Sequence, residues 1–241
     1  MADEGFTHPR LAAIYDALEP DRGDLDPYVR LVEEFGARRV LDIGCGTGVF
    51  ALLLAGRGIE VVGVDPALAS LDVARGKPGS ERVRWIHGDA SELPPLNVDL
   101  VTMTANVAQQ IGEADAWRET LRGAYTALRP GGRLVFETRD PARRAWEEWH
   151  REASYAVTDV PGVGAVESWV EVTGVDGQLV SFRWSYVFAA DGRTLTSDSR
   201  LRFRERGEVE AELVARGFVV EDVRDAPDRP GKELVFVARR P

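Results

Sequence analysis

The sequence predicts an α/β fold with a doubly wound, mostly parallel sheet, a C-terminal antiparallel hairpin and an inserted antiparallel β-meander. Short apolar runs alternate with helical patterns over residues 38–138, alternation of period two replaces them over 166–203, and two more apolar runs close the chain. A length of 241 residues with 44% hydrophobic residues suits one large domain. We divide this single domain, 1–241, into an N-terminal helical segment 1–20, a core of about 21–140 and 206–241, and an inserted lid or meander of about 141–205.

The first half of the chain contains five expected buried strands. Each is a short, mostly apolar run, and helical spacing of apolar residues fills the intervals between the runs. Strands joined by helices lie parallel, with right-handed crossovers. We expect strands at 38–43, 59–64, 83–87, 98–103 and 133–138, and helices at 47–57, 67–75 and 114–128.

The second half changes to antiparallel patterning. Between residues 166 and 203, large apolar side chains occupy every second position, and Asp-Gly pairs at 176–177 and 191–192 predict hairpin turns. We therefore expect a three-stranded meander there. A helix and the last two strands are expected at 207–216, 218–223 and 233–237.

The charge and the composition exclude several classes of partner. Thirty basic and 40 acidic residues give a net charge of −10, which disfavours binding to nucleic acid or to an anionic membrane. The apolar runs are too short to span a bilayer, and the first ten residues do not resemble a secretory signal. Cys45 is the single cysteine, and no histidine pair has metal-ligand spacing. Arginine is far more frequent than lysine, from which we expect a bacterial protein. From the preceding observations we also expect a cytoplasmic protein without a metal.

A glycine-rich segment, Asp42 to Gly48, lies between the first strand and its helix. Ligands bind at such carboxyl ends of strands in doubly wound sheets, although a plain tight turn is an alternative. A dinucleotide site has the spacing G-x-G-x-x-G, whereas this loop has G-x-G-x-G with Val49 in the last place. Asp42 precedes the loop, and an acid there repels a pyrophosphate but can pair with an amine.

The segment VLDIGCGTG resembles the first motif of the class I S-adenosylmethionine-dependent methyltransferases of small-molecule type, whose fold is a seven-stranded Rossmann-like sheet. Further segments resemble that family's later motifs in the same order: VVGVDPA, GDA, VDLVTMTANVAQQI, ALRPGGRLVFE and ARGFVVEDV. The resemblance covers roughly residues 35–140 and 207–240. It implies S-adenosyl-L-methionine as the cofactor and S-adenosyl-L-homocysteine as its product.

The resemblance also implies roles for individual residues. Asp65 would accept hydrogen bonds from both ribose hydroxyls, Asp89 would bind the adenine amino group, and the carbonyl of Thr104 would bind the methionine ammonium. An alternative for Asp65 and Asp89 is a helix N-cap, which does not exclude a ligand role. The cofactor-binding residues implied are Tyr15, Asp42, Gly44, Cys45, Gly46, Gly48, Asp65, Pro66, Asp89, Ala90 and Thr104.

The acceptor side is marked only by a concentration of aromatic residues between 141 and 190. These aromatics predict either a lid over a small substrate or the core beneath the meander. Candidates for a catalytic base are His150, Glu137 and Tyr155. Candidates for acceptor binding are Asn106, Arg139, Trp146, Trp149, Trp169, Trp184 and Tyr186.

The expected function is methyl transfer to a nitrogen or oxygen of a small-molecule acceptor, by a monomer or a homodimer. Inserted antiparallel strands after the fifth strand resemble enzymes that methylate amino sugars or small amines. Two alternatives remain open: an NAD(P)-dependent oxidoreductase, and a protein that binds S-adenosylmethionine without catalysis.

Overall fold

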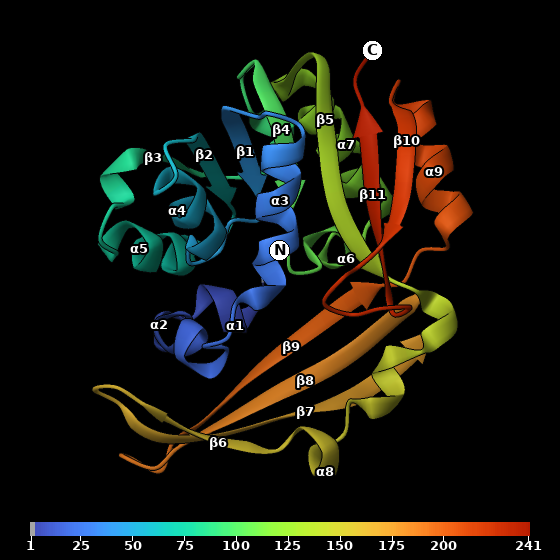
Figure 1. Ribbon diagram of the computed structural model, residues 1–241. Helices are drawn as coiled ribbons and strands as arrows, with labels where there is room; N and C mark the ends of the chain where they lie inside the picture. Colours follow the sequence, from blue (N-terminus) through green and yellow to red (C-terminus); the bar gives the residue numbers. More distant parts are fainter. Residues whose placement is uncertain (1–2) are drawn as a thin grey trace.

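The computed structural model describes residues 3–241, so the first two residues of the predicted N-terminal segment lie outside the described part. Within it, seven strands form one sheet in the order β10-β11-β5-β4-β1-β2-β3 (Figure 1). Strands β1 to β5 are parallel, and β11 is antiparallel to both β5 and β10. The predicted sheet and its C-terminal hairpin are confirmed. The strands are β1 Arg39–Ile43, β2 Glu60–Asp65, β3 Val83–His87, β4 Val98–Met103, β5 Leu128–Arg139, β10 Val219–Asp225 and β11 Glu233–Arg239.

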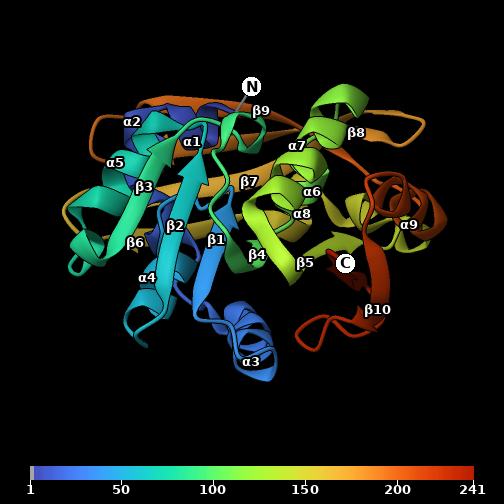
Figure 2. The same cartoon turned by 90° about the horizontal axis from the view of Figure 1, so that it is seen from above.

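Helices cover both faces of this sheet (Figure 2). On one face, Trp117 and Leu121 of α7 and Leu213 of α9 pack against strand residues such as Leu134. On the other, residues of α3 and α4, including Phe50, cover the same strands. The helices are α1 Glu4–Thr7, α2 Pro9–Leu18, α3 Asp26–Glu34, α4 Val49–Ala55, α5 Leu68–Gly76, α6 Val107–Gln110, α7 Ala114–Ala127, α8 Arg151–Ser154 and α9 Arg206–Ala215. Short 3₁₀ turns lie at Gly23–Leu25, Ser80–Arg82, Ala90–Glu92, Pro141–Arg143 and Ala145–Glu148.

A second, antiparallel sheet in the described chain has four strands in the order β6-β7-β8-β9, one more than expected. The additional strand, β6, pairs Ala156 with Ser168 and Val160 with Gly164. It was missed because it is a largely exposed edge strand without an apolar face. The predicted turns are confirmed, since Gly177 and Gly192 both adopt positive φ between paired strands. The strands are β6 Ala156–Val160, β7 Gly164–Asp176, β8 Leu179–Phe188 and β9 Thr194–Arg202.

The second sheet lies across the carboxyl ends of the parallel strands, with α1 and α2 beside it (Figure 1). The predicted apolar face of β8 is turned towards the rest of the protein, and Val180 and Phe188 are fully buried. Phe188 and Tyr186 pack with Leu11 and Ile14 of α2. This placement sets one sheet opposite the ligand-binding edge of the other. No helix of the described residues is both long and apolar enough to cross a membrane.

Candidate active site

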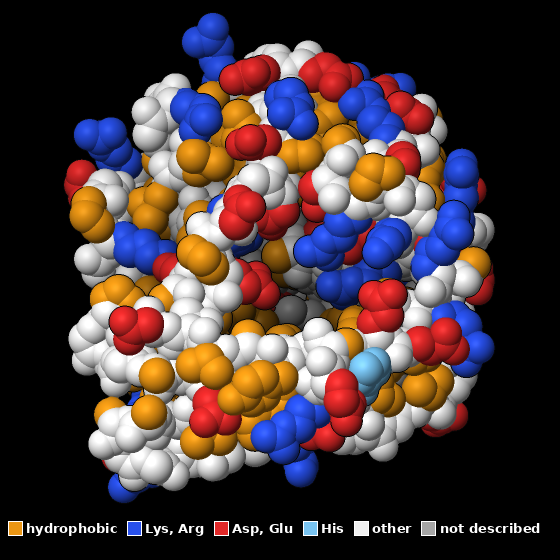
Figure 3. Space-filling view, turned by 60° about the horizontal axis from the view of Figure 1, so that its bottom comes forward, with side chains coloured by type: hydrophobic (Ala, Val, Ile, Leu, Met, Phe, Trp, Pro, Cys, Tyr) orange, Lys and Arg blue, Asp and Glu red, His pale blue; other side chains and the backbone are white. Residues whose placement is uncertain are grey.

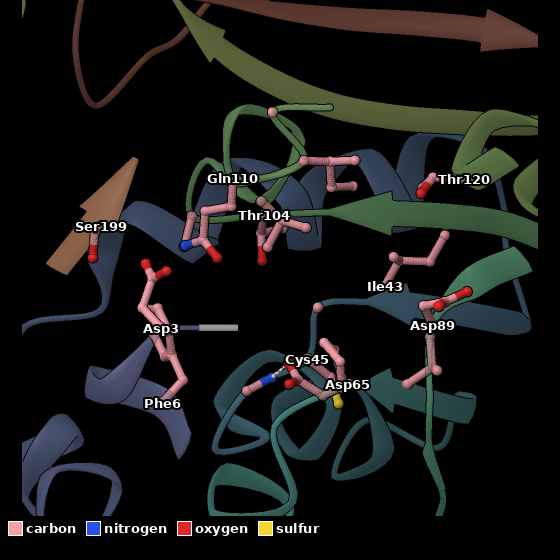
Figure 4. Close-up of a pocket in the computed structure, with 18 of the residues that line it drawn as sticks. Asp3, Phe6, Ile43, Cys45, Asp65, Asp89, Thr104, Gln110, Thr120 and Ser199 are labelled. Carbon is pink, nitrogen blue, oxygen red and sulfur yellow. Dashed lines mark hydrogen bonds between the residues drawn. The ribbon is translucent and has the colours of Figure 1, made fainter. Parts of the chain in front are cut away.

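A cavity of about 960 Å³ lies between the carboxyl ends of the parallel strands and the second sheet. The space-filling view shows a hollow near the middle of the face turned towards the viewer (Figure 3). All the residues implied in cofactor binding line the cavity except Gly48. The close-up shows Asp65 and Asp89 towards one end, and Asp3, Gln110 and Ser199 towards the other (Figure 4). We call these ends the cofactor half and the acceptor half.

The glycine turn after β1 uses its three glycines in different ways. Gly44, Gly46 and Gly48 all have positive φ, at 71°, 52° and 81°. A Cβ at Gly48 would meet the ring of Trp85 at 2.5 Å, so this glycine permits packing inside the protein and does not line the cavity as the resemblance implied. A Cβ at Gly46 would meet no described atom within 4 Å, because this glycine opens onto the cavity.

Asp65 ends β2 and lies two residues before Ala67, the N-cap residue of α5, so the alternative role of Asp65 as the N-cap is wrong. Its Oδ2 accepts a hydrogen bond from the Gly46 N–H at 2.8 Å, and its Oδ1 accepts one from the Ala67 N–H at 2.7 Å, at the start of α5. The side chain also lines the cavity. Burial raises the pKa of Asp65, and the two N–H donors oppose that effect. These two backbone hydrogen bonds therefore leave the carboxylate available to a ligand.

Asp42 ends the buried part of β1 beneath the glycine turn. It is 1% exposed and accepts a hydrogen bond from Thr102 Oγ1 at 3.0 Å. Burial raises the pKa of Asp42 to about 7, and the nearby charge of Asp65 acts in the same direction. A cation in the cofactor half would favour the ionised form of Asp42. Burial also raises the pKa of the Cys45 thiol well above its usual value, so this cysteine is not a thiolate nucleophile.

Asp89 follows β3 and caps the 3₁₀ turn Ala90–Glu92. Its Oδ1 accepts hydrogen bonds from the backbone N–H of Ser91, at 2.8 Å, and from the Ser91 hydroxyl. The expected N-cap is therefore present. Because Asp89 and Ala90 also line the cavity, capping and ligand binding are compatible at Asp89.

The acceptor half is lined by residues that the sequence did not single out. Asp3 and Phe6 come from the N-terminal segment, Gln110 from α6, and Phe182 and Ser199 from the second sheet. Burial raises the pKa of Asp3, and the Ser199 side chain opposes that effect. These positions belong to no motif. Only the alternation of apolar residues along β8 and β9 indicated that some of them share a face.

Three of the four tryptophans between 141 and 190 pack against core residues, and the fourth, Trp169, is at the surface. Trp149 packs edge-on against Phe182, with ring centroids 4.9 Å apart, and Trp184 stacks on Tyr186 at 6.0 Å. The ring of Trp146 lies 4.5 Å from that of Phe203. Trp169 donates a hydrogen bond to Glu171 at an exposed site. Of the described residues, those lining the 960 Å³ cavity include none of the seven acceptor-binding candidates: Asn106, Arg139, Trp146, Trp149, Trp169, Trp184 and Tyr186.

The three candidates for a catalytic base also lie outside that cavity in the described chain. His150 is exposed and pairs with Glu152 at 3.0 Å, and the Tyr155 hydroxyl donates to Glu167 at the surface. Glu137 is 3% exposed and lies in β5, two residues before the end of that strand. Burial raises the pKa of Glu137 to about 7. Nothing places these groups against a reacting atom.

The sheet order, the glycine turn and the acids at successive strand ends match the fold of the class I S-adenosylmethionine-dependent methyltransferases. Residues 40–132 match the family described as "Methyltransferase domain". Its sequence is 36% identical over 126 residues to the cypemycin N-terminal methyltransferase of a Streptomyces species, covering 52% of this chain and 51% of that protein. It is 34% identical over 109 residues to the demethylmenaquinone methyltransferase of Clavibacter sepedonicus, covering 44% and 43%. The chain thus spans about half the length of these relatives.

Solved structures resemble nearly the whole chain. CalS10, described as an amino pentose methyltransferase from Micromonospora echinaspora with bound S-adenosylmethionine, has a TM-score of 0.74 at 25% identity, covering 95% of this chain and 97% of that one. DesVI of Streptomyces venezuelae has a TM-score of 0.80 at 19% identity, covering 95% and 98%. The second likeness shows the fold alone. Both sheets of the protein therefore recur together in known structures.

Proposed function

We propose that the protein transfers the methyl group of S-adenosylmethionine to a nitrogen or oxygen of a small, hydrogen-bonding acceptor, with an amine favoured over a hydroxyl. The observation that carries the proposal is one continuous cavity, with Asp65 and the glycine turn in its cofactor half and Asp3 and Ser199 in its acceptor half. Its volume is near the top of the usual range for ligand pockets, roughly 300–1,000 Å³, which suits a cofactor together with a small acceptor.

The cofactor half fits the cofactor in detail. A carboxylate offers about four lone-pair sites, and Asp65 uses one on each oxygen for the N–H groups of Gly46 and Ala67. One site on each oxygen remains for a vicinal diol such as a ribose. Asp42 supplies a second negative charge below the turn, and Gly46 leaves the space open.

The bound cofactor supplies an electrophilic sulfonium methyl group, and the acceptor lone pair forms the new bond while the carbon–sulfur electrons stay on sulfur. The enclosing residues align the two molecules and exclude water. Asp3 is placed to accept a hydrogen bond from an acceptor ammonium or hydroxyl and to take up its proton. The relatives described as an N-terminal methyltransferase and an amino pentose methyltransferase support an amine acceptor.

The experiment has two stages. Calorimetric titration compares S-adenosylhomocysteine with NAD; tighter binding of NAD would favour the oxidoreductase and refute the proposal. The protein is then incubated with methyl-labelled S-adenosylmethionine and a panel of amines, each paired with the hydroxyl compound of the same shape. Label transfer to an amine but not to its hydroxyl partner is expected. Tight cofactor binding without transfer to any compound would favour the non-catalytic binder.

A further inference from the structure

Residues 104–112, between β4 and α7, form one side of the cavity along both the cofactor half and the acceptor half. Val107 contacts the glycine turn so closely that a Cβ on Gly44 would lie 2.5 Å from its methyl group. Thr104 and Ala105 line the cavity beside that turn, and Gln110 lines it beside the second sheet. A shift of this segment would therefore change the shape of the cofactor half directly.

The segment begins with an unfavourable backbone conformation. Ala105 and Asn106 have φ values of 55° and 62°, so two consecutive residues with a Cβ are left-handed. Such conformations persist only where the surroundings hold them, and they concentrate at functional sites. The structure must therefore contain a group that stabilises this turn.

Glu137 is that group. Its Oε1 accepts a hydrogen bond from the Asn106 N–H at 2.5 Å, and its Oε2 accepts one from the Tyr28 hydroxyl. The carboxyl is 3% exposed, and Glu137 is not among the described residues that line the cavity. Burying a carboxyl is costly, and here its two oxygens accept hydrogen bonds that an apolar side chain could not accept.

The other end of the segment is held separately. The guanidinium of Arg204 donates to the carbonyls of Ala108 and Ile111 at 3.0 and 2.6 Å. The fully buried Gln109 accepts from the Arg139 N–H and donates to the Arg202 carbonyl, and so ties α6 to the ends of β5 and β9. Changing Glu137 therefore releases the left-handed turn without releasing α6.

We propose that Glu137 is a positioning residue: by accepting the Asn106 N–H it holds the left-handed Ala105–Asn106 turn in the shape that the cofactor requires. It acts through that turn and does not touch the cofactor. The inference rests on the proposed function, because its test measures binding of the demethylated cofactor, S-adenosylhomocysteine.

The test measures the affinity for S-adenosylhomocysteine by calorimetry and hydrogen exchange of residues 104–112. Glu137→Leu removes the acceptor and is expected to weaken binding at least tenfold and to speed exchange of the segment. Glu137→Gln keeps an amide oxygen for the Asn106 N–H and is expected to stay within threefold of the unmodified protein. Tyr28→Phe removes the other hydrogen bond to Glu137 and serves as the matched control, with affinity within twofold.

A rescue separates positioning from general loss of stability. Glycine adopts positive φ without a Cβ penalty, so adding Asn106→Gly to Glu137→Leu is expected to recover at least threefold in affinity. If Glu137→Leu does not fold, Glu137→Asp, whose carboxyl is one methylene short of the Asn106 N–H, takes its place with the same expected order.

The outcomes distinguish the two claims. If the unmodified protein does not bind S-adenosylhomocysteine, the proposed function fails. If it binds, and Glu137→Leu binds equally well, the positioning role is wrong. The positioning role is also wrong if Glu137→Gln and Glu137→Leu weaken binding alike, or if Asn106→Gly restores nothing.

Discussion

Three glycines with positive φ allow backbone strain, internal packing and cofactor binding to be measured separately. Gly58 lies at an exposed turn after α4, Gly46 faces the cavity, and Gly44 lies against Val107. Alanine at each position meets different surroundings: no described atom within 4 Å at Gly58 and Gly46, and Val107 methyl groups at 2.5 and 2.6 Å at Gly44. The three alanine variants therefore form a controlled series.

The expected losses of stability follow from these contacts. A left-handed residue with a Cβ costs roughly 1–2 kcal/mol, so Gly58→Ala and Gly46→Ala should lose about that much. Gly44→Ala adds overpacking against a stiff β-branched side chain, about 1–3 kcal/mol more, for a total of about 2–5 kcal/mol. In a chain of this size each 1 kcal/mol lowers the melting temperature by about 2–4 °C.

The affinity for S-adenosylhomocysteine should follow a different order. Gly58→Ala leaves it unchanged, because that turn is remote from the cavity. Gly46→Ala places a methyl group in the cofactor half and should weaken binding at least tenfold, equivalent to about 1.4 kcal/mol. Thermal melting and calorimetry on the same preparations give both quantities. Normal affinity in Gly46→Ala would refute the placement of the cofactor beside this turn, whatever the melting temperatures show.

The remaining predictions concern single side chains. Asp65→Ala should weaken S-adenosylhomocysteine binding by about 3 kcal/mol or more while circular dichroism stays normal, since two charge-assisted hydrogen bonds are lost; retained affinity would leave Asp65 only its structural hydrogen bonds to Gly46 and Ala67. Trp149→Ala should cost about 3 kcal/mol of stability and leave that affinity unchanged, because its ring packs on Phe182 in the core; lost turnover at normal stability would restore the lid hypothesis. Asp3→Asn should slow methyl transfer without changing cofactor affinity, and equal rates would remove Asp3 as the proton acceptor. Burial raises the pKa of Glu137 from 4.5 to about 7, so the folded protein holds a proton that the unfolded chain releases, and stability falls as pH rises between those values. Glu137→Gln should remove that part of the decline, up to about 3 kcal/mol by pH 8, and an unchanged slope in denaturant titrations would contradict this.

The cofactor half could be predicted from sequence because its information is local. Asp42, the glycines and Asp65 lie at the carboxyl ends of β1 and β2, and a parallel sheet brings such ends together whatever the rest of the chain does. Gly48 shows the limit of this reasoning. Spacing predicts that a glycine is needed there, but only the structure shows that the space is filled by Trp85.

The acceptor half could not be predicted, because it forms where two sheets meet. Ser199 and Asp3 are nearly 200 positions apart, and neither belongs to a recurring motif. The aromatic residues of 141–190 left a lid and a core both possible for a physical reason: large rings supply much of the apolar area that a small sheet must bury. Trp149 and Trp184 are used for that purpose, against Phe182 and Tyr186.

The role of Glu137 could be predicted from the sequence only in part. Its position was suggestive, at the exit of β5 beside the cavity, but a carboxylate at a strand end can face a ligand or face the protein. Here it faces the Asn106 N–H and the Tyr28 hydroxyl, and the backbone that it holds carries Thr104 and Ala105 into the cavity wall. A strained turn that contacts a ligand on one side must be stabilised by the protein on its other side. The same reasoning applies to other folds of this type. A positioning residue there should be a buried carboxyl behind the residues that follow a strand, with hydrogen-bond donors from the backbone and a neighbouring helix as its partners.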